Sequence, residues 1–424
     1  MGTFKLRPNM LLGVSSSATQ VEGGELDHTW ADWCKKGNII DGSSPAVAAG
    51  HWERWYEDAL LMRSMGIQTC RFSVQWARVE PREGEFDQEA IRRIKEEVML
   101  LLGLGIRPLV TLHHFTNPMW FEEKGGWENP DNIKFFLGYV EKMVRELGHL
   151  VSEYITINEP NVYAAEGYYF GNWPPGKKSL KDASQVLSVM AAAHIRSYRL
   201  IHNLRRGLGF SDTRVGFSIQ FRASEGKTTM NPLHLPSVLR SEKLFQSAII
   251  EAMAMGRFTK PLKNYARARQ RPYCDFHGLS YYGRPAAHSR KGAAKNDQSW
   301  EPYPQGIIKC AQAMSDMCPL PIYITENGVC SNDDNLRIRF IYEHLNEISR
   351  CSLPVERYYY RSFLDGFEWT EGCSARYGLV SVDSDTLERS LKRSGEFYSR
   401  IMESRGVTQE LFDEYVAAGD NAGT

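Results

Sequence analysis

Residues 154–160 read Tyr-Ile-Thr-Ile-Asn-Glu-Pro, and this stretch shows a pattern that recurs along the chain and indicates its fold. Four aromatic or β-branched residues form a run typical of a buried strand, and the run ends in the polar pair Asn158-Glu159. Similar runs recur along the chain, and most of them also end in polar residues: 12–20, 69–75, 108–114, 214–220, 276–282, 321–326 and 358–369. Each of these runs is predicted to be a strand.

Longer segments with helical periodicity separate several of these strands. Residues 91–102 place apolar side chains at 91, 94, 98, 101 and 102, and residues 185–204 follow the same period. Eight strands alternating with helices predict an α/β protein with a (β/α)₈ TIM barrel. A doubly wound open sheet is the alternative fold. It would be expected to have a glycine-rich, phosphate-binding turn after the first strand, and the sequence has none there. We find no repeat or low-complexity linker, so residues 1–424 are predicted to form one domain.

Charge and composition exclude several classes of protein. The chain has 51 Lys plus Arg and 51 Asp plus Glu, which argues against a nucleic-acid or anionic-membrane partner bound through bulk charge. No apolar run approaches the roughly 20 residues of a membrane span, and the N-terminus lacks the features of a signal peptide. The eight cysteines form no CxxC pair, so we expect reduced thiols and a cytoplasmic protein. The sequence does not determine the oligomeric state.

The polar ends of the strands are the candidate functional positions, because TIM-barrel enzymes carry their chemistry at the C-terminal ends of the strands. Glu159 and Glu326 each stand at such an end beside an asparagine. Two carboxylates across one site suit glycoside hydrolysis, in which one is the acid and the other the nucleophile or base. Structural ion pairs or a metal site are alternatives, but the carboxylates are not clustered and His113-His114 lacks a zinc-protease spacing. We therefore predict no metal and no cofactor.

Several motifs together carry a resemblance that covers nearly the whole chain. The most specific are TINEP at 156–160 and ITENG at 324–328. Others are GVSSSATQVEGG (13–24), HWERWYED (51–58), RFSVQW (71–76), TLHHF (111–115), GGW (125–127), GLSYY (278–282), FEW (367–369) and RYGL (376–379). With these motifs the chain resembles glycoside hydrolase family 1, the retaining β-glycosidases with a (β/α)₈ barrel.

The resemblance implies a role for each matching residue. Glu159 resembles the general acid/base and Glu326 the nucleophile of a double displacement, with their carboxyl groups about 5–5.5 Å apart. Asn158 matches a residue that binds the sugar 2-hydroxyl. Arg71 matches a residue that lies beside the nucleophile and keeps it ionised, and Tyr282 matches a residue that hydrogen-bonds the nucleophile. The expected substrate-binding residues are Gln20, His114, Glu368, Trp369, Arg361 and Tyr377.

Three positions depart from the family pattern: Arg361 replaces a sugar-stacking Trp, Ser280 replaces a common Asn, and Gly366 replaces another Asn. Arg361 suggests an anionic sugar such as a uronate or a phosphorylated sugar, or else an ion pair with Glu368 or Asp365. The retained Glu368, with Ala375 where the 6-phospho branch has Lys, makes a phosphorylated sugar the weaker anionic option.

The resulting prediction is a retaining β-glycosidase, β-glucosidase-like, that hydrolyses a terminal β-linked sugar of a small glycoside or oligosaccharide. The alternatives are a glycosidase for an anionic sugar, a non-catalytic sugar-binding relative, and a transglycosylase that uses the same residues. The preferred sugar and the natural aglycone stay open.

Overall fold

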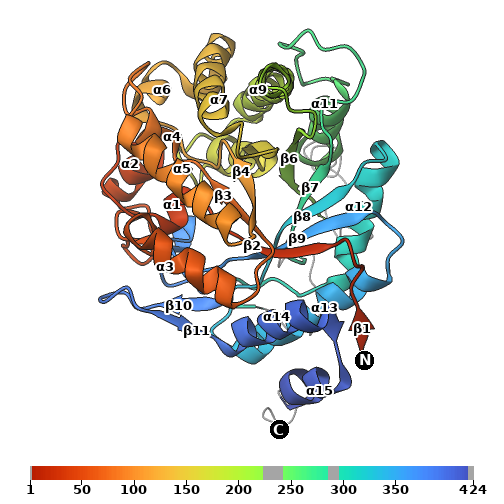
Figure 1. Ribbon diagram of the computed structural model, residues 1–424. Coiled ribbons are helices and arrows are strands. Elements are labelled where there is room, and N and C mark those ends of the chain that lie inside the picture. The colour runs from red at the N-terminus through yellow and green to blue at the C-terminus, as the bar shows by residue number, and fades with distance from the viewer. Residues whose placement is uncertain (1, 223–241, 285–295, 419–424) are drawn as a thin grey trace, which may run out of the picture.

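The computed structural model describes residues 2–222, 242–284 and 296–418, and a closed barrel of parallel strands lies at its centre (Figure 1). The strands follow one another around the barrel in chain order: β2 (Leu11–Ser15), β3 (Thr69–Ser73), β4 (Arg107–Thr111), β5 (Glu153–Asn158), β6 (Arg214–Gln220), β7 (His277–Tyr281), β8 (Ile322–Asn327) and β9 (Val355–Arg361). Strand β9 pairs with β2 and closes the barrel. The (β/α)₈ prediction is confirmed, and the open-sheet alternative is excluded.

Helices surround the barrel (Figure 1). The longer ones are α3 (His51–Ser64), α5 (Gln88–Gly103), α7 (Ile133–Leu147), α9 (Leu180–Gly207), α11 (Ile249–Met255), α12 (Pro304–Met317), α13 (Asp334–Arg350) and α14 (Arg393–Ser404). Helix α5 begins where the Asp87 carboxylate accepts the Glu89 and Ala90 N–H groups, which have no partner within the helix. Its buried face follows the predicted period, except that Leu102 is exposed. Among the described helices, none is long and apolar enough to cross a membrane.

Two predicted strands end well before the runs that suggested them. Strand β2 ends at Ser15, and Gln20 lies on the short helix α1 (Ala18–Val21). Strand β9 ends at Arg361, and Trp369 begins the 3₁₀ helix η6 (Trp369–Glu371). Beyond these strand ends the two segments bond to each other. For example, the Phe367 N–H donates to the Gln20 carbonyl at 2.8 Å.

Packed side chains fill part of the barrel interior. This cluster consists of Leu109, Ile155, Phe276, Tyr323 and Tyr359, with the Phe276 and Tyr323 rings stacked at 4.1 Å between centroids. Below the barrel in Figure 1, strand β1 (Phe4–Lys5) pairs with β12 (Gly406–Val407) and ties the two ends of the chain together.

Candidate active site

Glu159 follows directly on strand β5 and has a left-handed backbone, with φ at +41°. Such a conformation is uncommon for a residue with a side chain, and it concentrates at functional sites. The carboxyl group is buried, and its Oε1 atom has no hydrogen-bond partner among the described residues. Burial, and then the charge of Glu326, raise the pKa of Glu159 to about 8, with a Ser280 hydrogen bond acting in the opposite direction. Glu159 is therefore placed to carry a proton at neutral pH.

Glu326 lies near the end of strand β8 in a very different environment. Its Oε1 atom is 2.5 Å from Nη1 of the buried Arg71, and its Oε2 atom accepts the Tyr282 hydroxyl. Nε of Arg361 is 3.6 Å from the same Oε2 atom. Two guanidinium groups and a hydroxyl donor suit a carboxylate anion. The two acids thus line one pocket, and they differ in that Glu326 is paired with cations whereas Glu159 Oε1 has no described partner.

A chain of hydrogen bonds joins Glu326 to the residues around it. Arg71 also donates from Nη2 to Asn158 Oδ1 at 2.5 Å, and Asn158 Nδ2 lies 3.1 Å from His114 Nε2. Burial, and then the positive charges of Arg71 and Arg361, hold the pKa of His114 well below its usual range. His114 is therefore neutral, and its ring stacks on Trp369 at 5.9 Å between centroids.

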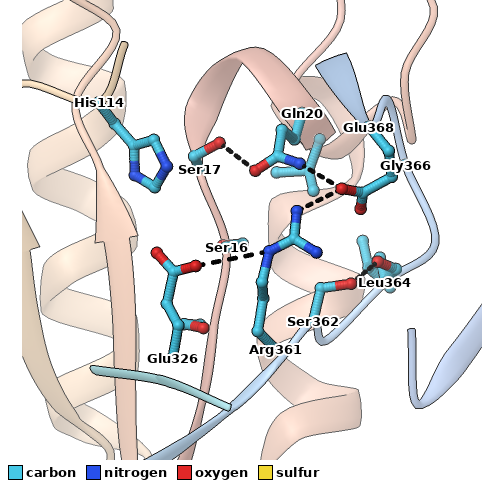
Figure 2. Close-up of a pocket in the computed structure, with 12 residues that line it drawn as sticks. Ser16, Ser17, Gln20, His114, Glu326, Arg361, Ser362, Leu364, Gly366 and Glu368 are labelled. Atoms are coloured by element: carbon cyan, nitrogen blue, oxygen red, sulfur yellow. Dashed lines mark hydrogen bonds and ion pairs between the residues drawn. The ribbon is translucent and has the colours of Figure 1, made fainter. Parts of the chain in front are cut away.

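Figure 2 shows how Gln20, Glu368 and Arg361 meet at one end of the site. Gln20 accepts from the Ser17 hydroxyl at 2.7 Å and donates to Glu368 Oε2 at 2.8 Å. Nη2 of Arg361 also donates to Glu368 Oε2, forming a buried ion pair. Burial raises the pKa of Glu368 to about 7, although the Arg361 charge acts in the opposite direction.

A pocket of about 650 Å³ opens over these groups. Glu159, Glu326, His114, Tyr282, Arg361, Glu368, Trp369 and Tyr377 all line it. Gln20, Arg71 and Asn158 reach it through the hydrogen bonds described above. The structure thus brings together all eleven residues that the sequence singled out, from seven strands and the loops that follow them. Within the described ranges no cluster of three or more His, Cys, Asp or Glu side chains could hold a metal ion.

Some pocket residues were not singled out from the sequence. Ile40, Trp300 and Gln298 line the outer part, and Ser17 orients Gln20. All four lie in loops, and the sequence pattern did not mark them. Trp173, in the Trp-Pro-Pro-Gly stretch at 173–176, also lines the pocket.

Comparison with known proteins identifies the family. The family model described as "Glycosyl hydrolase family 1" matches residues 3–280 and 281–407. The chain belongs to glycosyl hydrolase family 1. The expected family and the expected class of enzyme, a glycoside hydrolase, are therefore confirmed.

Relatives match this family 1 chain over almost its full length. The 1,4-beta-D-glucan glucohydrolase of Thermotoga neapolitana is 29% identical over 95% of this chain and 99% of its own. Beta-glucosidase A of Acetivibrio thermocellus is 29% identical over 96% of this chain and 100% of its own. Among solved structures, a beta-glycosidase from Pyrococcus horikoshii has a TM-score of 0.86 and 32% identity, with 98% of both chains covered. The Thermotoga maritima beta-glucosidase in complex with castanospermine has a TM-score of 0.85 and 26% identity, over 96% of this chain and 100% of its own.

Arg361 does not provide this family 1 enzyme with a free cation for an anionic sugar. Glu368 pairs with Arg361, while Asp365 pairs instead with Lys392 at 2.8 Å. The anionic-sugar hypothesis is therefore not favoured, and neither is a non-catalytic sugar-binding protein, because the matching proteins are named as glycosidases.

The structure also shows the surroundings of the other two positions that depart from the family pattern, Ser280 and Gly366. Ser280 is fully buried, and its hydroxyl lies 2.9 Å from that of Ser218. A Cβ atom added at Gly366 would collide with the Gln20 carbonyl oxygen. Gly366 therefore lets the loop after β9 approach the segment that carries Gln20.

Replacing Gly366 by alanine is expected to displace Gln20 and its partner Glu368. Because small misplacements of binding groups cost up to about 100-fold in rate, kcat/KM for a β-glucoside should fall about 10- to 100-fold. The collision should also lower the free energy of unfolding by about 1–3 kcal/mol. Steady-state kinetics and denaturant titration measure the two effects.

Gly138→Ala is the matched control, because Gly138 is exposed on helix α7 and an added Cβ would touch nothing within 4 Å. It should leave kcat/KM unchanged and raise the free energy of unfolding by about 0.5–1 kcal/mol. Equal kinetics in the two variants would show that Gly366 does not hold Gln20 in place.

Proposed function

We propose that this protein is a retaining β-glucosidase that acts on neutral sugars. The observation that carries the proposal is the contrast between Glu159, which is buried with a raised pKa, and Glu326, which is held between two guanidinium groups. Two carboxyl groups with opposite protonation states are what an acid and a nucleophile require. The names of the relatives, glucan glucohydrolase and beta-glucosidase, support glucose as the sugar.

The first step in this proposal forms a covalent glycosyl-enzyme. A Glu326 oxygen bonds to the anomeric carbon while the bond from that carbon to the leaving oxygen breaks, and the leaving oxygen takes the proton of Glu159. In the second step Glu159 removes a proton from water, the water oxygen bonds to the anomeric carbon, and Glu326 is released. Two inversions at one carbon retain the β configuration.

The other residues are assigned to holding the sugar and its attacking group. Arg71 and Tyr282 orient Glu326, and Asn158 presents its amide beside His114 toward the sugar 2-hydroxyl. The part of the sugar away from the 2-hydroxyl is assigned to Gln20, Glu368 and Trp369. Tyr377 lies beside Arg361. Ile40, Trp173 and Trp300 at the outer part of the pocket support an apolar or aromatic leaving group.

A panel of p-nitrophenyl glycosides tests the proposed substrate class. We expect β-glucoside to be cleaved with a kcat/KM of at least about 10⁴ M⁻¹s⁻¹, and β-glucuronide and 6-phospho-β-glucoside to be cleaved far more slowly. Nuclear magnetic resonance of the first product should show the β anomer. Preferred turnover of an anionic glycoside, or binding without any turnover, would contradict the proposal.

We also propose that the enzyme works in the cytoplasm, without a nucleic-acid partner. All eight cysteines lie in the described residues and none is bridged, which supports a reducing compartment. Titration of eight thiols per chain under denaturing, non-reducing conditions tests the thiol state. The equal numbers of basic and acidic residues provide no excess charge for a nucleic acid.

A further inference from the structure

Arg361 brings a permanent positive charge into the part of the site where the sugar reacts. Its side chain is only 9% exposed, and its guanidinium carbon lies 4.3 Å from the centre of the Tyr377 ring. The guanidinium spans two acids, with Nε 3.6 Å from Glu326 and Nη2 paired with Glu368 (Figure 2). An arginine stays protonated in such a place, so the charge is present throughout the reaction.

This charge opposes the chemistry expected next to it. The transition state of glycoside hydrolysis resembles an oxocarbenium ion, with positive charge on the anomeric carbon and ring oxygen. The anomeric carbon must lie against Glu326, because it bonds to that carboxylate. Because Arg361 lies next to Glu326, a guanidinium without a paired anion would repel the positive charge that develops on the anomeric carbon. This repulsion is strong where water is excluded.

Glu326 cannot neutralise Arg361 during the reaction. As the Glu326 oxygen bonds to the anomeric carbon, Glu326 becomes a neutral ester, and the negative charge passes to Glu159 when its proton leaves. Of the two described acids within ion-pair distance of Arg361, only Glu368 forms no bond to the sugar. It can therefore face Arg361 as a carboxylate throughout the reaction at a pH above its pKa of about 7. Gln20 donates to the same Glu368 oxygen, which fixes the carboxylate against the guanidinium.

We propose that Glu368, besides binding the sugar, neutralises Arg361 so that positive charge can develop at the anomeric carbon. This inference rests on the proposed glucosidase function and adds a second role to one of its sugar-binding residues. Glu368 and Arg361 therefore act as one electrostatic unit, and removing both charges should be less damaging than removing the Glu368 charge alone.

A double-mutant cycle with Glu368→Gln and Arg361→Met tests the coupling. Glutamine keeps the shape and hydrogen-bonding capacity of Glu368, and methionine replaces Arg361 with an uncharged, unbranched side chain. In the wild-type background Glu368→Gln should lower kcat for a β-glucoside about 100-fold, and in the Arg361→Met background about 10-fold or less. Arg145→Met is the control background, because Arg145 is exposed and pairs with Glu141 on helix α7, and there the 100-fold loss should persist.

Equilibrium binding provides a readout that needs no turnover and separates charge from hydrogen bonding. A protonated imino-sugar carries the transition-state charge, whereas a sugar lactam of the same configuration is neutral. By calorimetry, Glu368→Gln should weaken the imino-sugar about tenfold more than the lactam, and adding Arg361→Met should abolish this difference. A role in hydrogen bonding or positioning alone would weaken both ligands equally.

Additive losses of kcat in the cycle, or equal weakening of the two ligands, would overturn the inference while leaving a wild-type glucosidase intact. Failure of the wild type to cleave any β-glucoside would instead overturn the proposed function, and the ligand pair would still report on the Arg361 charge. Thermal melting of each variant shows whether it is folded under the assay conditions.

Discussion

Replacing Glu326 by alanine is expected to lower kcat for a β-glucoside about 10⁴-fold or more, because it removes the group that bonds to the anomeric carbon. Sodium azide should restore turnover of a 2,4-dinitrophenyl β-glucoside, since the small anion fits where the carboxylate was. Azide then attacks from the nucleophile's side in a single displacement. The product should be the α-glucosyl azide, identified by nuclear magnetic resonance.

Glu159→Ala is the matched control for this experiment. There Glu326 still forms the glycosyl-enzyme, and azide replaces water in the second step, so the product should be the β-glucosyl azide. The two variants therefore assign the two carboxylates independently by the anomer that each produces. An α-azide from Glu159→Ala, or wild-type turnover by Glu326→Ala, would reverse or remove the assignment.

The second large effect concerns the proton on Glu159. Because burial and the neighbouring Glu326 raise its pKa to about 8, Glu159 is protonated at lower pH and loses its proton as the pH rises through 8. The first step requires the protonated form of Glu159, so kcat/KM should fall tenfold per pH unit above this pKa. When Glu326 becomes an ester its charge disappears, which favours the ionised Glu159 that the second step needs.

Glu159→Gln should remove the alkaline limb of the pH profile. It should also cost about 10²- to 10⁴-fold in kcat/KM for an alkyl glucoside, whose leaving oxygen needs a proton. A dinitrophenyl glucoside needs little acid assistance, so its first step should be much less affected, and a burst of phenolate should precede slow turnover. An alkaline limb that persists in Glu159→Gln would assign the titration to another group.

The roles of Glu326 and Glu159 depend on their surroundings, and the sequence shows only part of these. The spacing of Asn158-Glu159 and Glu326-Asn327 after apolar runs predicted two strand-end carboxylates, and the closed barrel brings those strand ends to one pocket. The sequence also showed that both acids follow β-branched runs, which favours burial. It could not show that Arg71 donates to Glu326 and that Glu159 Oε1 lacks a described partner.

The barrel and the identity of the candidate residues could be predicted from the sequence alone, because these follow from a local period and from motifs within a few residues. The partner of Arg361 could not be predicted in this way, because Glu368, Asp365 and a substrate anion were all compatible with the sequence, and the folded chain pairs it with Glu368. Gln20 illustrates the same limit: an apolar run placed it in a strand, yet it lies on a short helix and meets Glu368, 348 residues away. The physical reason is that ion pairs and burial depend on distances that closure of the barrel sets, and no local pattern encodes these distances.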